Sequence, residues 1–318
     1  NEKYGNRDCA SYLKFEDLLA RKDLDAVMLA LPDHWHGIIA VAAAKAGKDI
    51  YGEKPLAYNI AEGRAIVNAV KQNSTVWQTG SWQRSVNHFR FACELVRNGR
   101  IGKIHTVHVG LPHGNPSIPL KAQKPAPVPS GFDYDRWLGP APWSPYCLRR
   151  CHGSFRWNRD YSNGRLADWA GHHVDIANWA METEFTAPTE IYDASAEYPS
   201  DLPLINTPGS FRFVCWYPKQ KFKMIISDSR QSPKGMGTYF IGEEGWIHVN
   251  RSGLNTSSEK MLKAGIKPNE IHLYTSYDHT GNFIDCIRTR NETIAPAEVA
   301  HRSIMVAHLG RAAIKIKK

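Results

Sequence analysis

The 318-residue sequence lacks several features that identify common functional classes. It contains no Gly-x-Gly-x-x-Gly phosphate loop, no Cys-x-x-Cys pair and no run of five basic residues. No apolar stretch approaches the roughly 18 to 20 residues of a membrane-spanning helix, and we find no internal repeat. These absences exclude a membrane-spanning protein and a repeat protein. The polar start at Asn1 does not resemble a signal peptide, but it leaves the compartment open between cytoplasm and periplasm.

The formal net charge is +9, and the basic residues are scattered along the chain. This pattern predicts a solvated surface with some attraction for anionic ligands, and no nucleic-acid partner. The six cysteines include Cys147 and Cys151, which precede His152, but the rest of a zinc site is absent. We predict free thiols and no bound metal.

Residues 1–80 show alternating strand and helix patterns. The apolar run 26–31 is typical of a strand buried on both faces. Asn59 precedes Glu62 by three residues, which predicts a capped helix start, and Gly47 predicts a helix end. The predicted helices are 15–19, 38–46 and 59–73, and the predicted strands are 26–31, 49–52 and 76–79. The fold prediction is α/β, a partial Rossmann-type, doubly wound parallel sheet.

Residues 81–318 form the second predicted domain, of α+β class, which would bind substrate and make oligomers. Consecutive strands predict a largely antiparallel open sheet. Its free face would need a cover, so we expect a homo-oligomer. The predicted strands are 103–109, 189–197, 210–217, 221–228 and 237–249; the predicted helices are 87–98, 164–181, 279–289 and 297–315; residues 112–145 are predicted as a long loop.

Lys54 lies just after a predicted strand, between Glu53 and Pro55. The carboxyl ends of parallel strands line the ligand crevice, and a lysine there can stabilise a developing alkoxide. A cis bond before Pro55 is plausible, since X–Pro bonds have a small trans preference. Alternatively, Lys54 is a solvent-facing residue at a turn.

Asp168, His172 and Asp175 share one face of a predicted helix, at i, i+4 and i+7. A carboxylate one turn before a histidine can orient the ring, and imidazole suits a general base for a sugar hydroxyl. His173 points roughly 100° away and fits packing or support beside the substrate. Alternatively, the acid favours the helix dipole and the histidines belong to the core.

The segment 31–36 follows the first long apolar strand, and the amides at the next helix start could face a pyrophosphate. His34 could equally be a loop residue there. The middle of the chain is rich in tryptophan, which packs well against pyranose rings and equally well in cores. These tryptophans are Trp82, Trp137, Trp143, Trp157 and Trp169.

Taken together, these segments resemble the Gfo/Idh/MocA family, named after glucose–fructose oxidoreductase, inositol dehydrogenase and a rhizopine-catabolism protein. The resemblance covers nearly the whole chain, and its combination of motifs is specific. The segments that carry it are 25–36, 46–55, 83–84, 98–102, 168–175, 279–283 and 297–301.

The resemblance implies that Lys54 binds the reacting hydroxyl, that His172 takes its proton while hydride passes to nicotinamide, and that Asp168 positions the substrate or His172. It implies NAD or NADP contacts from Pro32, His36, Glu53, Lys54, Pro55 and Gln83. It implies substrate contacts from Arg84, Trp157 and His173. Segment 137–142, with Gly164 and Trp157, resembles a branch whose members are often exported and act on glycosides or free sugars.

The expected function is NAD(P)-dependent oxidation of a secondary hydroxyl of a sugar, glycoside or cyclitol. A redox-dependent glycoside hydrolase or lyase, and a non-catalytic sugar-binding or assembly subunit or inactive fragment, are the alternatives. Two departures from the family pattern stand out. Ala170 replaces a usual glycine, with Gly171 following, and the glycine-rich loop expected upstream of Asn1 is missing. Without that loop we expect this chain to bind NAD(P) weakly.

Overall fold

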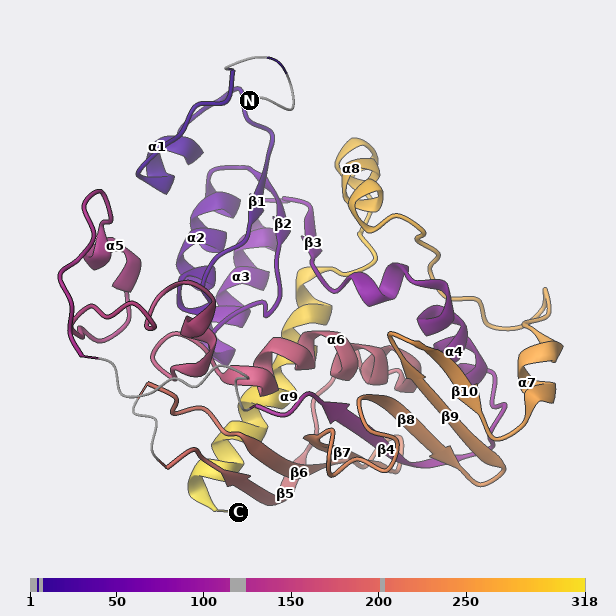
Figure 1. Cartoon of the computed structure of the whole chain (residues 1–318). Coiled ribbons are helices and arrows are strands. Elements are labelled where there is room, and N and C mark those ends of the chain that lie inside the picture. The colour runs from indigo at the N-terminus through magenta and orange to yellow at the C-terminus, as the bar shows by residue number, and fades with distance from the viewer. Residues whose placement is uncertain (1–4, 6–7, 115–123, 201–203, 318) are drawn as a thin grey trace.

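The computed structural model describes residues 5, 8–114, 124–200 and 204–317. Its strands form two sheets, a three-stranded parallel sheet and a seven-stranded mixed sheet (Figure 1). This confirms the predicted order of a parallel Rossmann-like part followed by a mostly antiparallel part. No described helix combines the length and the apolar character of a membrane span.

The small sheet has the order β1-β2-β3 with parallel pairing throughout. Its strands are β1 (Ala26–Leu29), β2 (Asp49–Gly52) and β3 (Trp77–Thr79), and its helices are α1 (Phe15–Leu19), α2 (Asp33–Lys45) and α3 (Ile60–Gln72). The predicted cap is confirmed, since Asn59 Oδ1 accepts from the Glu62 amide at 2.9 Å. Gly47, with φ of 72°, ends α2 as predicted.

Two predictions for this sheet were wrong. Strand β1 is not buried on both faces, because the Met28 side chain is 66% exposed. Helix α2 begins at Asp33, five residues earlier than predicted, so His34 and His36 are helical. Pro32 holds the extended backbone that precedes a helix start, with φ of −61° and ψ of 144°.

The large sheet has the order β10-β9-β8-β4-β7-β6-β5, and only the β4–β7 pair is parallel. Strand β4 occupies the centre of the sheet and is mostly buried. Strand β10 was not predicted. The strands are β4 (Ile104–Leu111), β5 (Glu190–Glu197), β6 (Ser210–Tyr217), β7 (Phe222–Asp228), β8 (Gly237–Gly242), β9 (Gly245–Asn250) and β10 (Gly253–Thr256).

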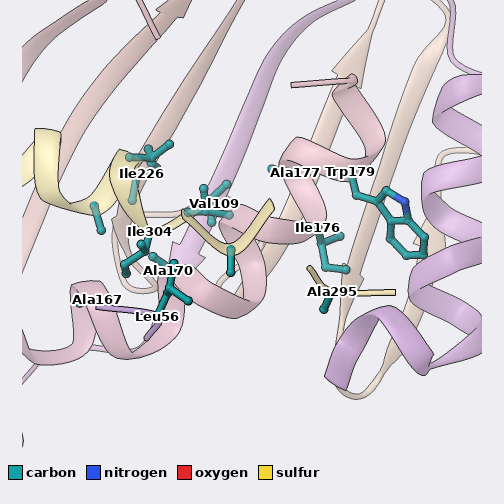
Figure 2. Packing of buried hydrophobic residues seen from close by; sticks show 14 of the residues in the cluster. Leu56, Val109, Ala167, Ala170, Ile176, Ala177, Trp179, Ile226, Ala295 and Ile304 are labelled. Carbon is teal, nitrogen blue, oxygen red and sulfur yellow. The ribbon is translucent and has the colours of Figure 1, made fainter. Parts of the chain in front are cut away.

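Helices α4 (Asn87–Arg97), α6 (Gly164–Met181) and α9 (Ala297–Ile316) cover one face of the large sheet (Figure 1). Small residues of α6 allow close packing on the sheet and on α9, where Ala170 lies among Val109, Ile226 and Ile304 (Figure 2). Helices α7 (Glu259–Ala264) and α8 (His279–Thr289) lie outside this layer. This packing fixes α6, which carries the second motif, between the two sheets.

The loop predicted for 112–145 is partly structured, although residues 115–123 lie outside the described part. Helix α5 (Tyr134–Leu138) and the 3₁₀ helix η3 (His152–Trp157) build a small aromatic core of their own. This 124–162 segment packs on the start of α2, where the His34 amide donates to the Tyr161 carbonyl at 3.2 Å. The indole of Trp35 donates to the Trp137 carbonyl at 3.1 Å.

Candidate active site

The two motifs of the sequence meet where β2 ends against α6. The Lys54 ammonium donates to Asp168 Oδ1 at 2.5 Å and to the Asp168 carbonyl at 3.0 Å. Both side chains are largely buried, and the bond between Lys54 and Pro55 is cis, as considered from the sequence. The structure thus places the cation and the acid within one site, although 114 positions separate them.

Helix α6 admits the lysine because it has a glycine at the contact. A Cβ added to Gly171 would lie 3.2 Å from Lys54 Cβ. The Gly171 carbonyl accepts from Ser81 Oγ at 2.7 Å, which ties the helix to the segment after β3. The glycine at position 171, rather than 170, therefore lets the lysine stem pass.

Asp168 is held as a carboxylate by several cations. Arg165 lies 3.2 Å from Oδ2, and Arg156 lies 3.9 Å from Oδ1. Burial alone would raise the pKa of Asp168, but Lys54, Arg156 and Arg165 together lower it below its ordinary value. Its oxygens bind Lys54 and Arg165, so Asp168 does not orient the His172 ring as the spacing had suggested.

His172 lies one turn after Asp168 and is 3% exposed. Its ring meets Trp82 at 6.4 Å and Trp169 at 5.6 Å, both edge-on, and its Nδ1 has no hydrogen-bond partner among the described residues. Burial, followed by the charge of Lys54, lowers the pKa of His172 well below its ordinary value. A neutral imidazole at neutral pH can accept a proton.

The other acid of the predicted face has a structural partner. Asp175 accepts from Arg84 Nε at 2.6 Å and from Ser303 Oγ at 2.8 Å, and Arg84 also binds Glu184 at 2.8 Å. Arg84 is 2% exposed and is fully engaged, so the structure does not bring it to the cavity where substrate contact was expected. Neighbouring Gln83 is completely buried, and its amide group has no partner in the described chain.

A cavity of about 360 Å³ opens beside Lys54 at the carboxyl ends of β1 and β2. Four predicted cofactor residues and Asp168 line it, together with side chains of the 124–162 segment. The lining consists of Ala30, Leu31, Pro32, Asp33, Glu53, Lys54, Pro55, Phe132, Trp137, His152, Phe155, Arg156 and Asp168.

Six predicted residues do not line this cavity: His172, Gln83 and Arg84, described above, and His36, Trp157 and His173. His36 is buried in α2, and its Nε2 lies 2.9 Å from the Leu31 carbonyl oxygen. Trp157 is buried beside Ile205. His173 is completely buried and stacks on Trp169 at 5.6 Å, and burial lowers its pKa to about 3. His173 therefore packs in the core, as its position on the other side of the helix indicated.

The sequence alone did not single out Asp33, which is buried in this cavity. Its Oδ2 accepts from Ser162 Oγ at 2.6 Å, across 129 positions. Burial raises the pKa of Asp33 to about 7, against the hydrogen bond from Ser162. Arg156 was missed as well, because no local pattern distinguishes it from other arginines. The only sequence signal for Asp33 was its position, directly after Pro32 and before a predicted helix.

The start of α2 was also expected to face a pyrophosphate. The Tyr161 carbonyl already accepts from the His34 amide, and Trp35 N donates to the Pro32 carbonyl. The 124–162 segment thus occupies this helix start, and that expectation is wrong. In the described part of the chain, no group of three histidine, cysteine, aspartate or glutamate side chains is placed to hold a metal ion.

Residues 96–318 match a model described as the C-terminal alpha/beta domain of an oxidoreductase family, and residues 2–81 match one described as its NAD-binding Rossmann fold. Myo-inositol 2-dehydrogenase of Thermotoga maritima is 30% identical over 129 residues, 41% of this chain and 35% of that protein. Levoglucosan dehydrogenase of Pseudarthrobacter phenanthrenivorans is 39% identical over 82 residues, 26% of this chain and 21% of that protein.

The matched part of the chain spans less than half the length of its curated relatives, 30% and 42% for two uncharacterized oxidoreductases. Among solved structures, a levoglucosan dehydrogenase in complex with NADH and levoglucosan superposes with a TM-score of 0.67 at 17% identity. That alignment covers 96% of this chain and 82% of the other. At this identity the likeness shows a shared fold.

Proposed function

The chain belongs to the Gfo/Idh/MocA family of oxidoreductases, and from this premise we propose that it oxidises a secondary hydroxyl of a sugar, glycoside or cyclitol with NAD or NADP. One observation carries the proposal. The Lys54 ammonium forms an ion pair with Asp168, and Asp168 lies one helical turn before the buried His172 on α6. The family relatives named as sugar and inositol dehydrogenases support the substrate class.

Lys54 is the residue that we assign to the substrate hydroxyl. Its ammonium has three protons, and the two hydrogen bonds to Asp168 leave one for a ligand oxygen. Asp168 fixes the position of the ammonium, and Gly171 gives its stem room. A cation held in this way stabilises the alkoxide that develops as the hydroxyl loses its proton.

His172 is the group that we assign to proton removal. Its pKa is lowered by burial and by neighbouring cations, so the ring is neutral at physiological pH and needs no prior deprotonation. For this role, the His172 ring must lie within hydrogen-bond distance of the same substrate oxygen that Lys54 binds. Trp82 and Trp169 hold the ring from two sides and restrict its rotation.

The crevice at the ends of β1 and β2 fits the reactive end of a dinucleotide. Pro32, Glu53 and Pro55 line it, and the unpartnered amide of Gln83 lies in the segment after β3. When bound, the nicotinamide supplies the hydride acceptor. The described residues offer no glycine-rich cradle for the phosphates, and the start of α2 is occupied by Tyr161.

We also propose a homo-oligomer through the large sheet. Thr238 faces the helices, since its hydroxyl donates to the His173 carbonyl, so its neighbour Tyr239 faces the other way. The ring of Tyr239 meets His108, Trp246 and His248 on that face. In the described part of the chain no helix covers this aromatic surface, so a second copy would bury it.

The proposal is tested by following reduced nicotinamide when sugars and cyclitols are added with NAD or NADP. Lys54→Ala and His172→Ala should each lower turnover by a factor of about 10² to 10⁴. Arg288→Ala, which removes an exposed arginine of α8, is the matched control. Unchanged turnover in both site variants would remove this mechanism. Aglycone release without net nicotinamide reduction would instead indicate the hydrolase or lyase alternative.

A further inference from the structure

Arg251 lies in the turn between β9 and β10, and its charge contributes to the lowered pKa of His172. Its guanidinium carbon is 4.7 Å from the ring centre of Trp82 and 4.4 Å from that of Trp169. The same two indoles contact His172. A cation, two aromatic faces and the assigned base therefore form one cluster.

The backbone beneath Arg251 is firmly held. The Asn250 carbonyl lies 2.9 Å from His88 Nε2, and the Asn250 side chain accepts from the Ser252 amide at 2.8 Å. The Asn250 amide group donates to the Met236 carbonyl at 3.3 Å. The turn thus fixes where the guanidinium can reach, which is the requirement for selective recognition.

In the described part of the chain, no carboxylate forms an ion pair with the Arg251 guanidinium. Among the described residues no side chain forms a hydrogen bond or ion pair with Arg251, whose contacts are the two rings, although its side chain remains exposed. Partial burial lowers the pKa of Arg251, and the charge of Asp168 acts in the opposite direction. Asp168 already has Lys54, Arg165 and Arg156 around it. Five donor hydrogens therefore remain available to a ligand.

We propose that Arg251 is a specificity residue that binds a carboxylate on the substrate, so that the enzyme acts on an acidic sugar such as a uronic acid or its glycoside. This inference rests on the proposed function and adds the substrate class. A guanidinium fixed over aromatic rings offers a planar pair of donors, and a carboxylate accepts both. The indole of Trp82, which is 40% exposed, suits the apolar side of the sugar ring.

The arrangement of the acids agrees with this orientation. Asp33 and Glu53 lie at the ends of β1 and β2, on the side assigned to the cofactor. Arg251 comes from the β9–β10 turn of the large sheet and does not line that cavity. A substrate carboxylate at Arg251 would thus be kept away from these acids, while its reacting hydroxyl faces Lys54 and His172.

The alternative is that Arg251 only fastens the β9–β10 turn to α6 through cation–π contact, worth about 0.5 to 2 kcal/mol. Arg251→Lys separates the two roles, because lysine keeps the charge and the ring contact but loses the paired donors. Arg251→Gln removes the charge. Arg288→Gln, at an exposed arginine of α8, is the matched loss of charge elsewhere.

The test compares binding of methyl glucuronide with binding of methyl glucoside to this chain by titration calorimetry, without nicotinamide. The wild type should prefer the glucuronide by about 10-fold or more, as for a charged, paired hydrogen bond. Arg251→Gln should abolish that preference, Arg251→Lys should reduce it, and Arg288→Gln should leave it intact. Thermal unfolding of each variant reports any loss of the turn itself.

Equal affinity for the two glycosides, no binding of the glucuronide, or an unchanged preference in Arg251→Gln would overturn the inference. These outcomes do not depend on turnover. If nicotinamide-linked oxidation of neutral sugars were then observed, the proposed function would stand and only the substrate class would fall. Glucuronide binding that depends on Arg251, without any turnover, would support the binding site and count against the oxidoreductase mechanism.

Discussion

Gly171 packs its bare backbone against the stem of Lys54, and a Cβ there would come within 3.2 Å of Lys54 Cβ. This contact links the two motifs in addition to the ion pair between Lys54 and Asp168. It limits which residue α6 can carry at position 171. Position 171 lies in the interior of α6, where glycine is otherwise unfavourable by about 0.5 to 1 kcal/mol relative to alanine.

We therefore expect Gly171→Ala to affect activity and stability in opposite directions. The added methyl group should raise helix propensity, yet push the Lys54 stem by a few tenths of an ångström. Turnover should fall by about 10-fold, since small misplacements at a reacting centre are costly, while the melting temperature holds or rises. Steady-state kinetics and calorimetry measure the two effects. A Gly153→Ala variant, which meets no atom within 4 Å, is the control.

The second prediction concerns the titration of His172. Burial and then Lys54 lower its pKa, so kcat/KM should stay level from neutral pH down to well below the ordinary histidine value of about 6.5. In Lys54→Met the loss of one cation should move the pKa of His172 upward, though burial keeps it low. Lys54→Arg keeps the charge and should change it little. NMR of the His172 ring protons as a function of pH measures this pKa. Equal pKa shifts in Lys54→Met and Lys54→Arg would contradict the assigned effect of the Lys54 charge.

Much of this architecture could be predicted because the signals are local. Asn59 and Glu62 form a cap from neighbouring residues, and the helix 164–181 was predicted with the bounds that the structure shows. The exposed face of β1 could not be predicted, because the apolar run 26–31 does not reveal that no other described element covers Met28. The start of α2 at Asp33 was missed because the first turn of this helix is mostly polar and the apolar pattern begins only at Ile38.

The residues of the site also fall into those that could be predicted from sequence motifs and those that could not. Lys54 and Asp168 belong to motifs, and the structure brings them together. Asp33, Arg156 and Arg251 come from three separate segments, and their importance depends on tertiary contacts that no spacing encodes. Arg84 shows the converse error: a polar residue beside the expected site is buried against Asp175 and Glu184.

The third prediction follows from Arg84. Its guanidinium neutralises Asp175 and Glu184 and lies 4.8 Å over the Trp179 ring. Arg84→Met should leave two poorly compensated acids and lower the free energy of unfolding by about 3 to 5 kcal/mol. Urea denaturation measures this loss, and Arg288→Met, at an exposed site, should stay within about 0.5 kcal/mol. A stable Arg84→Met protein with weakened substrate binding would restore the role expected from the sequence.

The fourth prediction addresses the aromatic face of the large sheet. If a second copy covers Tyr239, then Tyr239→Glu should place a charge in the interface and shift the protein toward monomer. Light scattering coupled to size-exclusion chromatography measures the mass. Tyr277→Glu introduces the same change at a side chain that is 77% exposed, and it should leave the mass unaltered. A wild type that is monomeric at high concentration would contradict the proposed oligomer.

The fifth prediction concerns Asp33, whose pKa is raised from 3.8 to about 7 by burial. Between these values the folded state keeps a proton that the unfolded chain has lost, so the stability of the fold should fall as pH rises and level off above about 7. Asn cannot ionise, and its amide oxygen can still accept from Ser162. Asp33→Asn should therefore be more stable than the wild type above neutral pH, by at most about 4 kcal/mol, and the gain should vanish toward pH of about 4.

Urea unfolding at several pH values measures the difference, with the exposed Glu243→Gln as control. A gain that is independent of pH would show that Asp33 is ionised in the folded protein, and would place a second carboxylate beside Asp168 in the cavity.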